Sequence, residues 1–205
     1  MTTYTLDIET DSLDAKVIWC VCVKTLGDNE WVVATKPEDL SFIQKTDIII
    51  THNGIEFDIP ILNRLWSTGI TLSQVRDTLI LSRLFNPDRD GGHSLGQWGK
   101  RLAFDKLGFS EFDQYSEEMV RYCKRDVALT EKVYLHLRRE GSEFSDKSIV
   151  LEHEIAHIIN LQSKHGFYLD REKANNLFEE TYYKAKLIER EIKQEFKPKP
   201  KFVRE

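Results

Sequence analysis

The start of the chain alternates between apolar and polar side chains with a period of two. Leu6 and Ile8 alternate with Asp7 and Glu9 within residues 3–9. Because successive side chains of a strand point to opposite faces, this pattern predicts a strand that buries one apolar face. We therefore expect both carboxylates to lie on the other face of the same strand.

Three further apolar runs are too short for helices and predict strands, at residues 17–23, 31–33 and 48–50. The first two are joined by residues 25–30, whose composition is typical of a turn, so they form a hairpin. A helix is expected near residues 37–44, before the third run. Strands followed by alternating helices and strands predict an α/β domain.

Helical periodicity dominates the rest of the chain. Asp77, Ser94 and Asp170 stand where a helix N-cap is expected, and Gly166 stands at a C-cap position. The glycine- and charge-rich residues 86–93 predict a mobile surface loop. The helices that we expect cover residues 60–66, 79–85, 95–102, 117–139, 147–164 and 170–196.

The composition changes near Gly141, from mixed α/β before it to purely helical after it. This change predicts a first domain at residues 1–141 and a helical extension at residues 142–205. The basic, proline-interrupted segment 197–201 is expected to be extended. The last helix carries an apolar stripe with no evident local partner, which is typical of an interface: Leu177, Phe178, Tyr182, Ala185, Ile188 and Ile192.

Composition sets limits on the class of protein. No run approaches the 18 apolar residues of a membrane span, and the start lacks the pattern of a secretory signal, so we expect no membrane association. The chain has three cysteines, Cys20, Cys22 and Cys123, and their spacing is not that of a zinc site. An odd number of cysteines fits reduced intracellular thiols. The net charge of −5 does not exclude a nucleic-acid enzyme, because carboxylates gathered around metal ions contribute to it.

Acidic side chains on three separate elements are the candidate chemistry. Asp7 and Glu9 share a strand, Asp58 lies where a strand passes into a helix, and Asp126 follows Tyr122 by four residues on one helix face. Each group also has a plainer interpretation: a solvated strand pair, an N-cap at Asp58, and a surface pair on the helix.

If the four carboxylates converge, they need a compensating cation, since burying unpaired charge is costly. Hard oxygen ligands favour Mg²⁺ or Mn²⁺. Two such ions about 3.5–4 Å apart can stabilise the attacking and leaving oxygens of a phosphoryl displacement. The phenol of Tyr122 is a candidate for orienting the attacking water.

These residues carry a resemblance to a known family. Asp7-Ile8-Glu9-Thr10, Asn53 with Phe57-Asp58, and Tyr122-x-x-x-Asp126 resemble the three motifs of the DEDDy proofreading 3′–5′ exonucleases, which have a ribonuclease-H-like fold. Arg121 stands where a related branch would have histidine, so the chain is similar to the tyrosine branch.

The resemblance extends to the exonuclease domain of family A replicative DNA polymerases from short-tailed phages, over roughly residues 3–140. It rests on the following segments: His52-Asn53-Gly54, residues 77–84, Gly92-His93-Ser94-Leu95 with Trp98-Gly99, and Glu117-Glu118-Met119. Residues 151–170 are similar to the segment where such polymerases begin the thumb region of the polymerase domain.

The resemblance implies two Mg²⁺ or Mn²⁺ ions: Asp7, Glu9 and Asp126 would hold the first, and Asp7 with Asp58 the second. It implies a 3′–5′ exonuclease that removes nucleoside 5′-monophosphates from single-stranded or frayed DNA ends, as the proofreading part of a polymerase. The partner would be a polymerase domain or chain, in a bacterial or phage-infected cytoplasm. The terminal nucleotides would contact Thr10, Leu13, Asn53 and Phe57.

Two alternatives remain at this point. His153-Glu154-Ile155-Ala156-His157 matches the helical zinc-protease motif. However, the apolar residues of that helix lie on the opposite side, so we expect His153 and His157 to face solvent or another domain. The other alternative is a non-catalytic nucleic-acid-binding module of the same fold, although all four acids and the tyrosine are present. The choice between DNA and RNA stays open.

Overall fold

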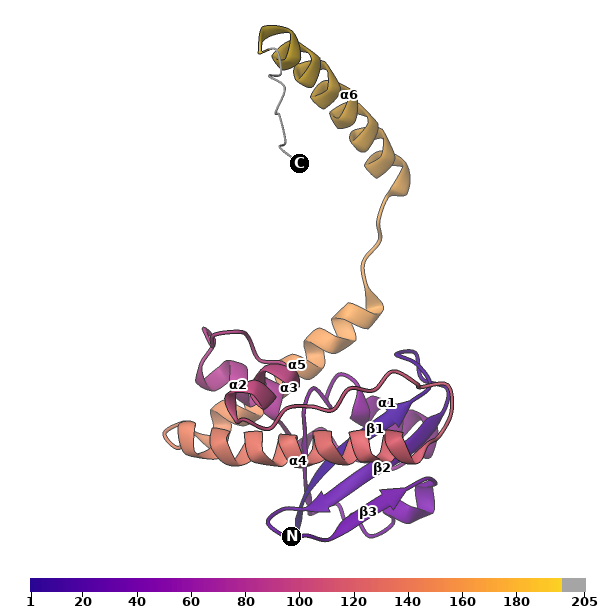
Figure 1. Cartoon of the computed structure of the whole chain (residues 1–205), viewed down its shortest axis with the longest axis vertical. Coiled ribbons are helices and arrows are strands. Elements are labelled where there is room, and N and C mark those ends of the chain that lie inside the picture. Colours follow the sequence, from indigo (N-terminus) through magenta and orange to yellow (C-terminus); the bar gives the residue numbers. More distant parts are fainter. Residues whose placement is uncertain (197–205) are drawn as a thin grey trace, which may run out of the picture. The chain divides into compact units, whose positions relative to one another are not determined.

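Five short strands form one mixed sheet in the computed structural model, which describes residues 1–196 (Figure 1). The spatial order is β3-β2-β1-β4-β5. The first three strands are antiparallel neighbours, whereas β4 and β5 run parallel to β1. The strands are β1 Thr3–Thr10, β2 Ile18–Thr25, β3 Trp31–Ala34, β4 Ile48–Thr51 and β5 Val75–Asp77.

Six α-helices and two short 3₁₀ helices accompany the sheet within the described residues. The predicted caps are confirmed: Asp77, Ser94 and Asp170 each accept a hydrogen bond from a backbone N–H of the helix that follows. The helices are α1 Asp58–Trp66, α2 Thr78–Phe85, α3 Leu95–Arg101, α4 Glu117–Glu140, α5 Asp146–His165 and α6 Arg171–Glu195, with η1 Pro37–Leu40 and η2 Leu72–Gln74.

The two faces of the sheet carry different layers. Leu6 and Ile8 of β1 pack into the cluster that includes α1, as the alternation predicted. The opposite face is covered by α4, which lies across the sheet in Figure 1. Cys20 and Cys22 of β2 pack there against Cys123 of α4. The Asp7 and Glu9 side of β1 therefore faces the α4 layer.

Two local expectations are corrected by the structure, and a third gains detail. The element near residues 37–44 is only the 3₁₀ helix η1, which begins at Pro37. The edge strand β5 was missed, because three residues are too few to show a period. In the loop 86–93, Arg89 pairs with Glu140 and lies 4.5 Å from the centre of the Trp98 ring, so this charged side chain is held rather than free.

The described chain divides at Ser163/Lys164, not at the predicted boundary near Gly141. Gly141 does end α4, and a Cβ there would lie 2.2 Å from the Phe85 ring. However, α5 still packs on the first unit, through polar contacts described below. The second unit begins at Lys164 and contains α6, none of whose residues is buried. The segment 197–201 lies outside the described residues.

Candidate active site

Strand β1 places two acids side by side under α4. Asp7 is paired in register with Cys22, and Glu9 with Cys20, and a register shift follows between Glu9 and Thr10. Glu9 is buried and Asp7 is half-buried. Their carboxylate oxygens lie within 4.8 Å of each other and of the Cys123 sulfur. The predicted shared face of the strand is therefore confirmed, and it is a covered face rather than a solvated one.

Asp58 reaches this site from the turn between β4 and α1. Asn53 has a left-handed backbone, with φ 65°. At Gly54 a Cβ would lie 2.4 Å from the Thr51 hydroxyl, so the tight turn requires glycine there. Asp58 is the first residue of α1, and its Oδ1 accepts a hydrogen bond from the backbone N–H of Ile8 at 3.2 Å. The acid is thus fixed against β1 and does not serve as an N-cap.

Asp77 holds this turn in place and was not singled out as part of the site by the sequence. Its carboxylate accepts hydrogen bonds from the backbone N–H groups of Asn53, Ile55 and Leu79, at 2.8, 3.1 and 2.9 Å. One buried side chain therefore satisfies three backbone donors from two segments. The same residue caps α2, so the Asn53–Asp58 turn and α2 are joined.

Helix α4 supplies Asp126 and Tyr122 one turn apart. Asp126 is buried, and its Oδ2 lies 2.6 Å from the Lys106 ammonium. Its Oδ1 is buried and has no hydrogen-bond partner among residues 1–196. The Tyr122 ring stacks on Phe109, with ring centres 5.6 Å apart. The helix thus places one incompletely satisfied carboxylate near Asp7 and Glu9, whose pKa values the charge of Asp126 raises, and carries the phenol one turn away.

The electrostatics of the site favour binding of a cation. Burial, followed by the charge of Asp58, raises the pKa of Asp7 well above its ordinary range. Burial raises the pKa of Glu9 to about 8 and that of Asp58 to about 7. Burial also raises the pKa of Asp126, although Lys106 opposes this shift. A divalent ion would remove the cost of ionising these groups together.

The donor set fits hard cations. The charges of Asp58, Glu9 and Asp126 each raise the pKa of Asp7, so the four carboxylates lie near enough to interact. The Oδ1 of Asp126 is an oxygen without a partner in the described structure. Oxygen ligands of this kind suit Mg²⁺ or Mn²⁺. The ion pair with Lys106 shows that a positive charge is already held against Asp126.

Besides Asn53 of the turn before α1, the three other predicted substrate contacts have different surroundings. Leu13 is 89% exposed, next to the strand that carries the acids. Thr10 is buried, and its hydroxyl donates to the Ser12 carbonyl at 2.9 Å. Phe57 packs partly against the core beside α1. These positions stay predictions.

Sequence reasoning missed Lys106 and Phe109. Both lie in the irregular segment between α3 and α4, where no period marks a structural face. Lys106 acts on a residue twenty positions away, and Phe109 supports Tyr122 from thirteen positions away. Neither spacing is a helical or strand repeat, so no pattern could have identified them.

Of the two surroundings expected for His153, solvent or another domain, the structure excludes solvent. His153 is 3% exposed, its Nε2 accepts a hydrogen bond from the Asp77 backbone N–H at 2.8 Å, and its Nδ1–H donates to the Ile149 carbonyl at 2.7 Å. Burial lowers the pKa of His153 to about 4. Both ring nitrogens are occupied by the backbone, which argues against a zinc ligand here.

The comparisons with solved structures confirm the predicted ribonuclease-H-like α/β fold. The structure of Brucella melitensis NrnC with bound Mg²⁺ is similar, with a TM-score of 0.63, 18% identity, and coverage of 80% of this chain and 86% of that chain. A second structure, of NrnC bound to pGG, gives a TM-score of 0.59 over 77% of this chain and 80% of that one, again at 18% identity.

At the level of sequence, the chain is similar to phage DNA polymerases. The DNA-directed DNA polymerase of Enterobacteria phage T3 is 22% identical over 93% of this chain, and that of Escherichia phage T7 is 22% identical over 75%. The aligned parts are 36% and 30% of those relatives, so the chain spans about a third of their length. No protein-family model matches. The predicted resemblance to the exonuclease domain of phage-type polymerases is thus confirmed.

Proposed function

We propose that the first unit is a metal-dependent 3′–5′ exonuclease that removes nucleoside 5′-monophosphates from DNA ends. The convergence of Asp7, Glu9, Asp58 and Asp126 on one largely buried spot carries the proposal. Carboxylates gathered in this way are costly to a fold unless they bind cations. Similarity to two phage DNA polymerases supports a proofreading role in DNA replication.

In this proposal Asp7, Glu9 and Asp126 hold one Mg²⁺ or Mn²⁺, and Asp7 with Asp58 holds a second. The Mg²⁺ bound in the similar NrnC structure supports the choice of ion. Bound ions of this kind supply charge stabilisation to the attacking and leaving oxygens of phosphodiester hydrolysis.

The chain's own groups position the reactants. Burial raises the pKa of Tyr122 above its ordinary value, so the phenol keeps its proton at neutral pH and can hold an attacking water by hydrogen bonding. Phe109 fixes the orientation of this ring by stacking. Lys106 must release Asp126 when a cation binds there, because both compete for the same carboxylate.

The substrate in this proposal is a single-stranded or frayed 3′ end. Leu13 and Phe57 would pack against the terminal bases, and Thr10 and Asn53 would contact the terminal nucleotides. Apolar and aromatic packing of this kind tolerates any base but requires an unpaired strand. The NrnC structure bound to pGG is consistent with a short nucleic acid in a similar fold.

The polymerase context concerns the helical extension. The exposed stripe on α6 would contact a polymerase domain or chain, and the reaction would take place where DNA is replicated, in the cytoplasm of a bacterial or phage-infected cell. No described helix is long and apolar enough to cross a membrane.

The proposal is tested with end-labelled single-stranded oligodeoxynucleotides, with and without Mg²⁺. We expect stepwise shortening from the 3′ end, release of nucleoside 5′-monophosphates, and inhibition by a 3′-phosphate. Asp7→Ala should abolish hydrolysis, whereas Asp14→Ala, which removes an exposed acid nearby, should not.

Cutting of a circular single strand would contradict the exonuclease assignment. DNA binding without Mg²⁺-dependent shortening would instead favour a non-catalytic nucleic-acid-binding module. A matched oligoribonucleotide decides between DNA and RNA.

A further inference from the structure

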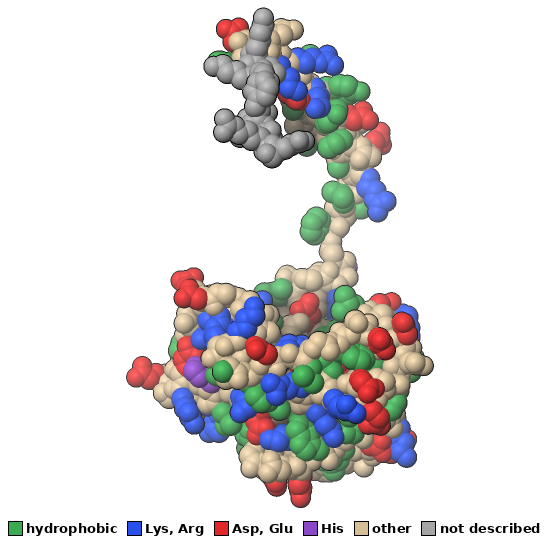
Figure 2. Space-filling view, viewed as in Figure 1, with side chains coloured by type: hydrophobic (Ala, Val, Ile, Leu, Met, Phe, Trp, Pro, Cys, Tyr) green, Lys and Arg blue, Asp and Glu red, His purple; other side chains and the backbone are tan. Residues whose placement is uncertain are grey.

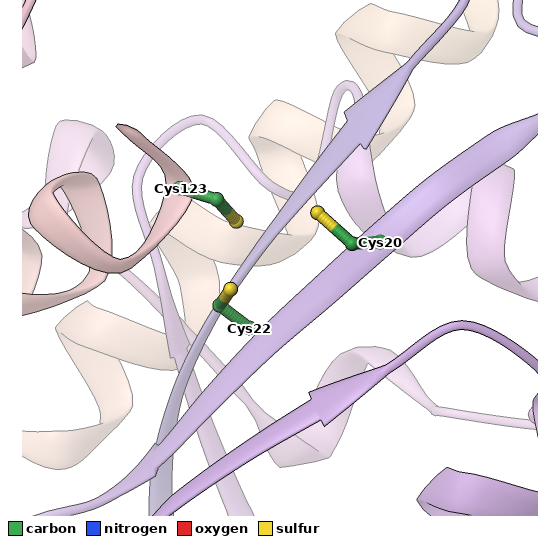
Figure 3. Close-up of side chains that lie close together, drawn as sticks. All are labelled: Cys20, Cys22 and Cys123. Carbon is green, nitrogen blue, oxygen red and sulfur yellow. The ribbon is translucent and has the colours of Figure 1, made fainter. Parts of the chain in front are cut away.

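A cluster of thiols lies directly beside the acids and has no role in the proposed hydrolysis. Cys20 and Cys22 point from β2 toward α4, and Cys123 points from α4 toward β2 (Figure 3). All three side chains are fully buried. Their sulfur atoms lie within 4.8 Å of one another. They are also the only cysteines of the chain.

Three sulfurs arranged in this way match the ligand set of a soft cation. Around one zinc ion the Zn–S distance is about 2.3 Å, which places neighbouring sulfurs roughly 4 Å apart. Small side-chain rotations would bring the observed sulfurs to that spacing. Thiolate ligands favour Zn²⁺ and related ions, whereas carboxylates favour Mg²⁺. The two ligand sets are therefore chemically distinct although they are neighbours.

Asp7 links the two sets. The Cys123 thiol donates to the Asp7 backbone carbonyl at 3.5 Å, and its sulfur lies 3.7 Å from Asp7 Oδ2. The second distance is close to the separation of two ligands of one ion. Asp7 Oδ2 therefore lies beside the Cys123 sulfur, outside the group of three sulfurs, and is a candidate for the fourth ligand of the tetrahedral set that zinc prefers.

We propose that Cys20, Cys22 and Cys123 form a binding site for a thiophilic divalent cation of the zinc class, with Asp7 as the fourth ligand. Each ligand binds in its deprotonated form, so any thiol that carries a proton in the metal-free protein releases it when the ion binds. The cation offsets the charge of the thiolates in this apolar layer. Because Asp7 is also the predicted ligand of both Mg²⁺ ions, occupancy of the thiol site would oppose Mg²⁺ binding.

The cadmium ion alone is the probe, because sulfur-to-cadmium charge transfer absorbs in the ultraviolet and carboxylates give no such band. We expect the band to saturate at one equivalent of Cd²⁺ for each chain, with release of protons in weakly buffered solution. Because the site is buried, Cd²⁺ is added both to the folded protein and during refolding. The melting transition is recorded alongside, to show that the protein with bound Cd²⁺ is folded.

Cys22→Ser is the matched variant, since it nearly keeps the size of the side chain and still offers a donor where the thiol contacts the Val120 carbonyl. We expect it to fold and to weaken Cd²⁺ binding by more than about 100-fold, since losing even an indirect partner of a ligand costs 10- to 100-fold. The proposed site would be overturned if the absorption band is absent both when Cd²⁺ is added to the folded protein and when it is added during refolding. It would also be overturned if Cys22→Ser gives the same band as wild type. The three cysteines would then be ordinary core residues.

The effect on catalysis rests on the proposed nuclease and is tested separately. One equivalent of Cd²⁺ should inhibit Mg²⁺-dependent hydrolysis by the wild-type chain and spare Cys22→Ser. Equal inhibition of both proteins, or none of either, would overturn the coupling through Asp7. The absorption band is recorded without DNA, so the thiol site can be confirmed even if the chain proves not to be a nuclease.

Discussion

At the scale of single residues, the ammonium group of Lys106 is the cation that contacts Asp126. The Lys106 side chain is 30% exposed, so it can swing out to solvent while Asp126 stays buried. Burial by itself lowers the pKa of Lys106, but the contact with Asp126 holds it above the ordinary value. The lysine is therefore charged at neutral pH and competes with any metal at this carboxylate.

Replacing Lys106 with alanine should tighten Mg²⁺ binding by roughly tenfold, equivalent to about 1.4 kcal/mol, because the competing charge is gone. The same change should destabilise the metal-free protein by about 1–3 kcal/mol, since Asp126 loses its partner. Isothermal titration and denaturant unfolding measure the two effects. Lys132→Ala, an exposed lysine on α4, is the control. Unchanged or weaker Mg²⁺ binding by Lys106→Ala would show that Lys106 does not compete with Mg²⁺ for Asp126.

Tyr122→Phe removes one hydroxyl and keeps the stacking on Phe109. We expect the rate of hydrolysis to fall by roughly 10- to 1000-fold, the range for an orienting or hydrogen-bonding contact. Mg²⁺ affinity should stay the same, because the phenol is not a metal ligand. Single-turnover rates across a pH series measure the effect. A rate equal to wild type at every pH would make Tyr122 a structural residue.

At the scale of elements, α5 packs with its polar side inward. His153 and Asn160 are buried, and the Asn160 amide donates to the Ile55 carbonyl at 3.2 Å. The apolar side is exposed: Ile158, for example, is 54% exposed. The helix is held by hydrogen bonds to the turn that carries Asp58, so α5 stabilises the turn that positions this acid.

His153→Phe tests this support, because it approximately fills the same space and leaves the Asp77 N–H without an acceptor. We expect a loss of about 1–3 kcal/mol in the free energy of unfolding. His157→Phe, on a less buried position of the same helix, should cost about 0.5 kcal/mol or less. Chemical denaturation of both variants compares them. Equal costs would show that the His153 contact contributes nothing specific.

At the scale of the whole molecule, the buried acids should make the free energy of unfolding depend both on pH and on bound metal ions. Their pKa values are raised in the folded state, from near 4.5 to about 8 for Glu9 and from near 3.8 to about 7 for Asp58. The folded state therefore binds more protons than the unfolded state. Unfolding free energy must fall as the pH rises through this range.

The metal-free protein should lose thermal stability between pH 6.5 and 8, and Mg²⁺ should restore it. Buried His52 and His153 have lowered pKa values, so their opposing contribution appears only below about pH 6.5. Melting temperatures with a chelator and with Mg²⁺ test this. Asp7→Asn should flatten the slope in chelator. A metal-free stability that rises over this range would contradict the burial of ionisable acids.

The two compact units should also differ in how strongly their backbone amides are protected from hydrogen exchange. No residue of α6 is buried, and pairs such as Lys184 with Glu180 contribute only about 0.3–0.5 kcal/mol each. Figure 2 shows hydrophobic side chains exposed between charged ones along this helix. We expect fast amide hydrogen exchange in residues 171–195 and slow exchange in the buried part of α4. Slow exchange throughout α6 in a monomeric sample would show that the helix is stable without a partner.

The sequence by itself determined most of the elements, though not β5, and the chemical inventory. Alternation in β1 put Asp7 and Glu9 on one face, and the capping residues Asp77 and Ser94 marked where helices begin. Four acids on three elements predicted the candidate site. These signals are local, since they depend on backbone periods and on hydrogen bonds within a few residues.

Only the tertiary structure decided what covers each face. The helical period of α5 distinguishes an apolar face from a polar face, but it does not show which face packs against the first unit. The polar face with His153 is the buried one, because the backbone N–H of Asp77 needs a hydrogen-bond acceptor. The contact of Lys106 with Asp126, and that of Cys123 with Cys20 and Cys22, join residues with no regular spacing. Such contacts depend on how α4 packs against the sheet and the neighbouring segments, and the pattern of residues along the sequence does not show this packing.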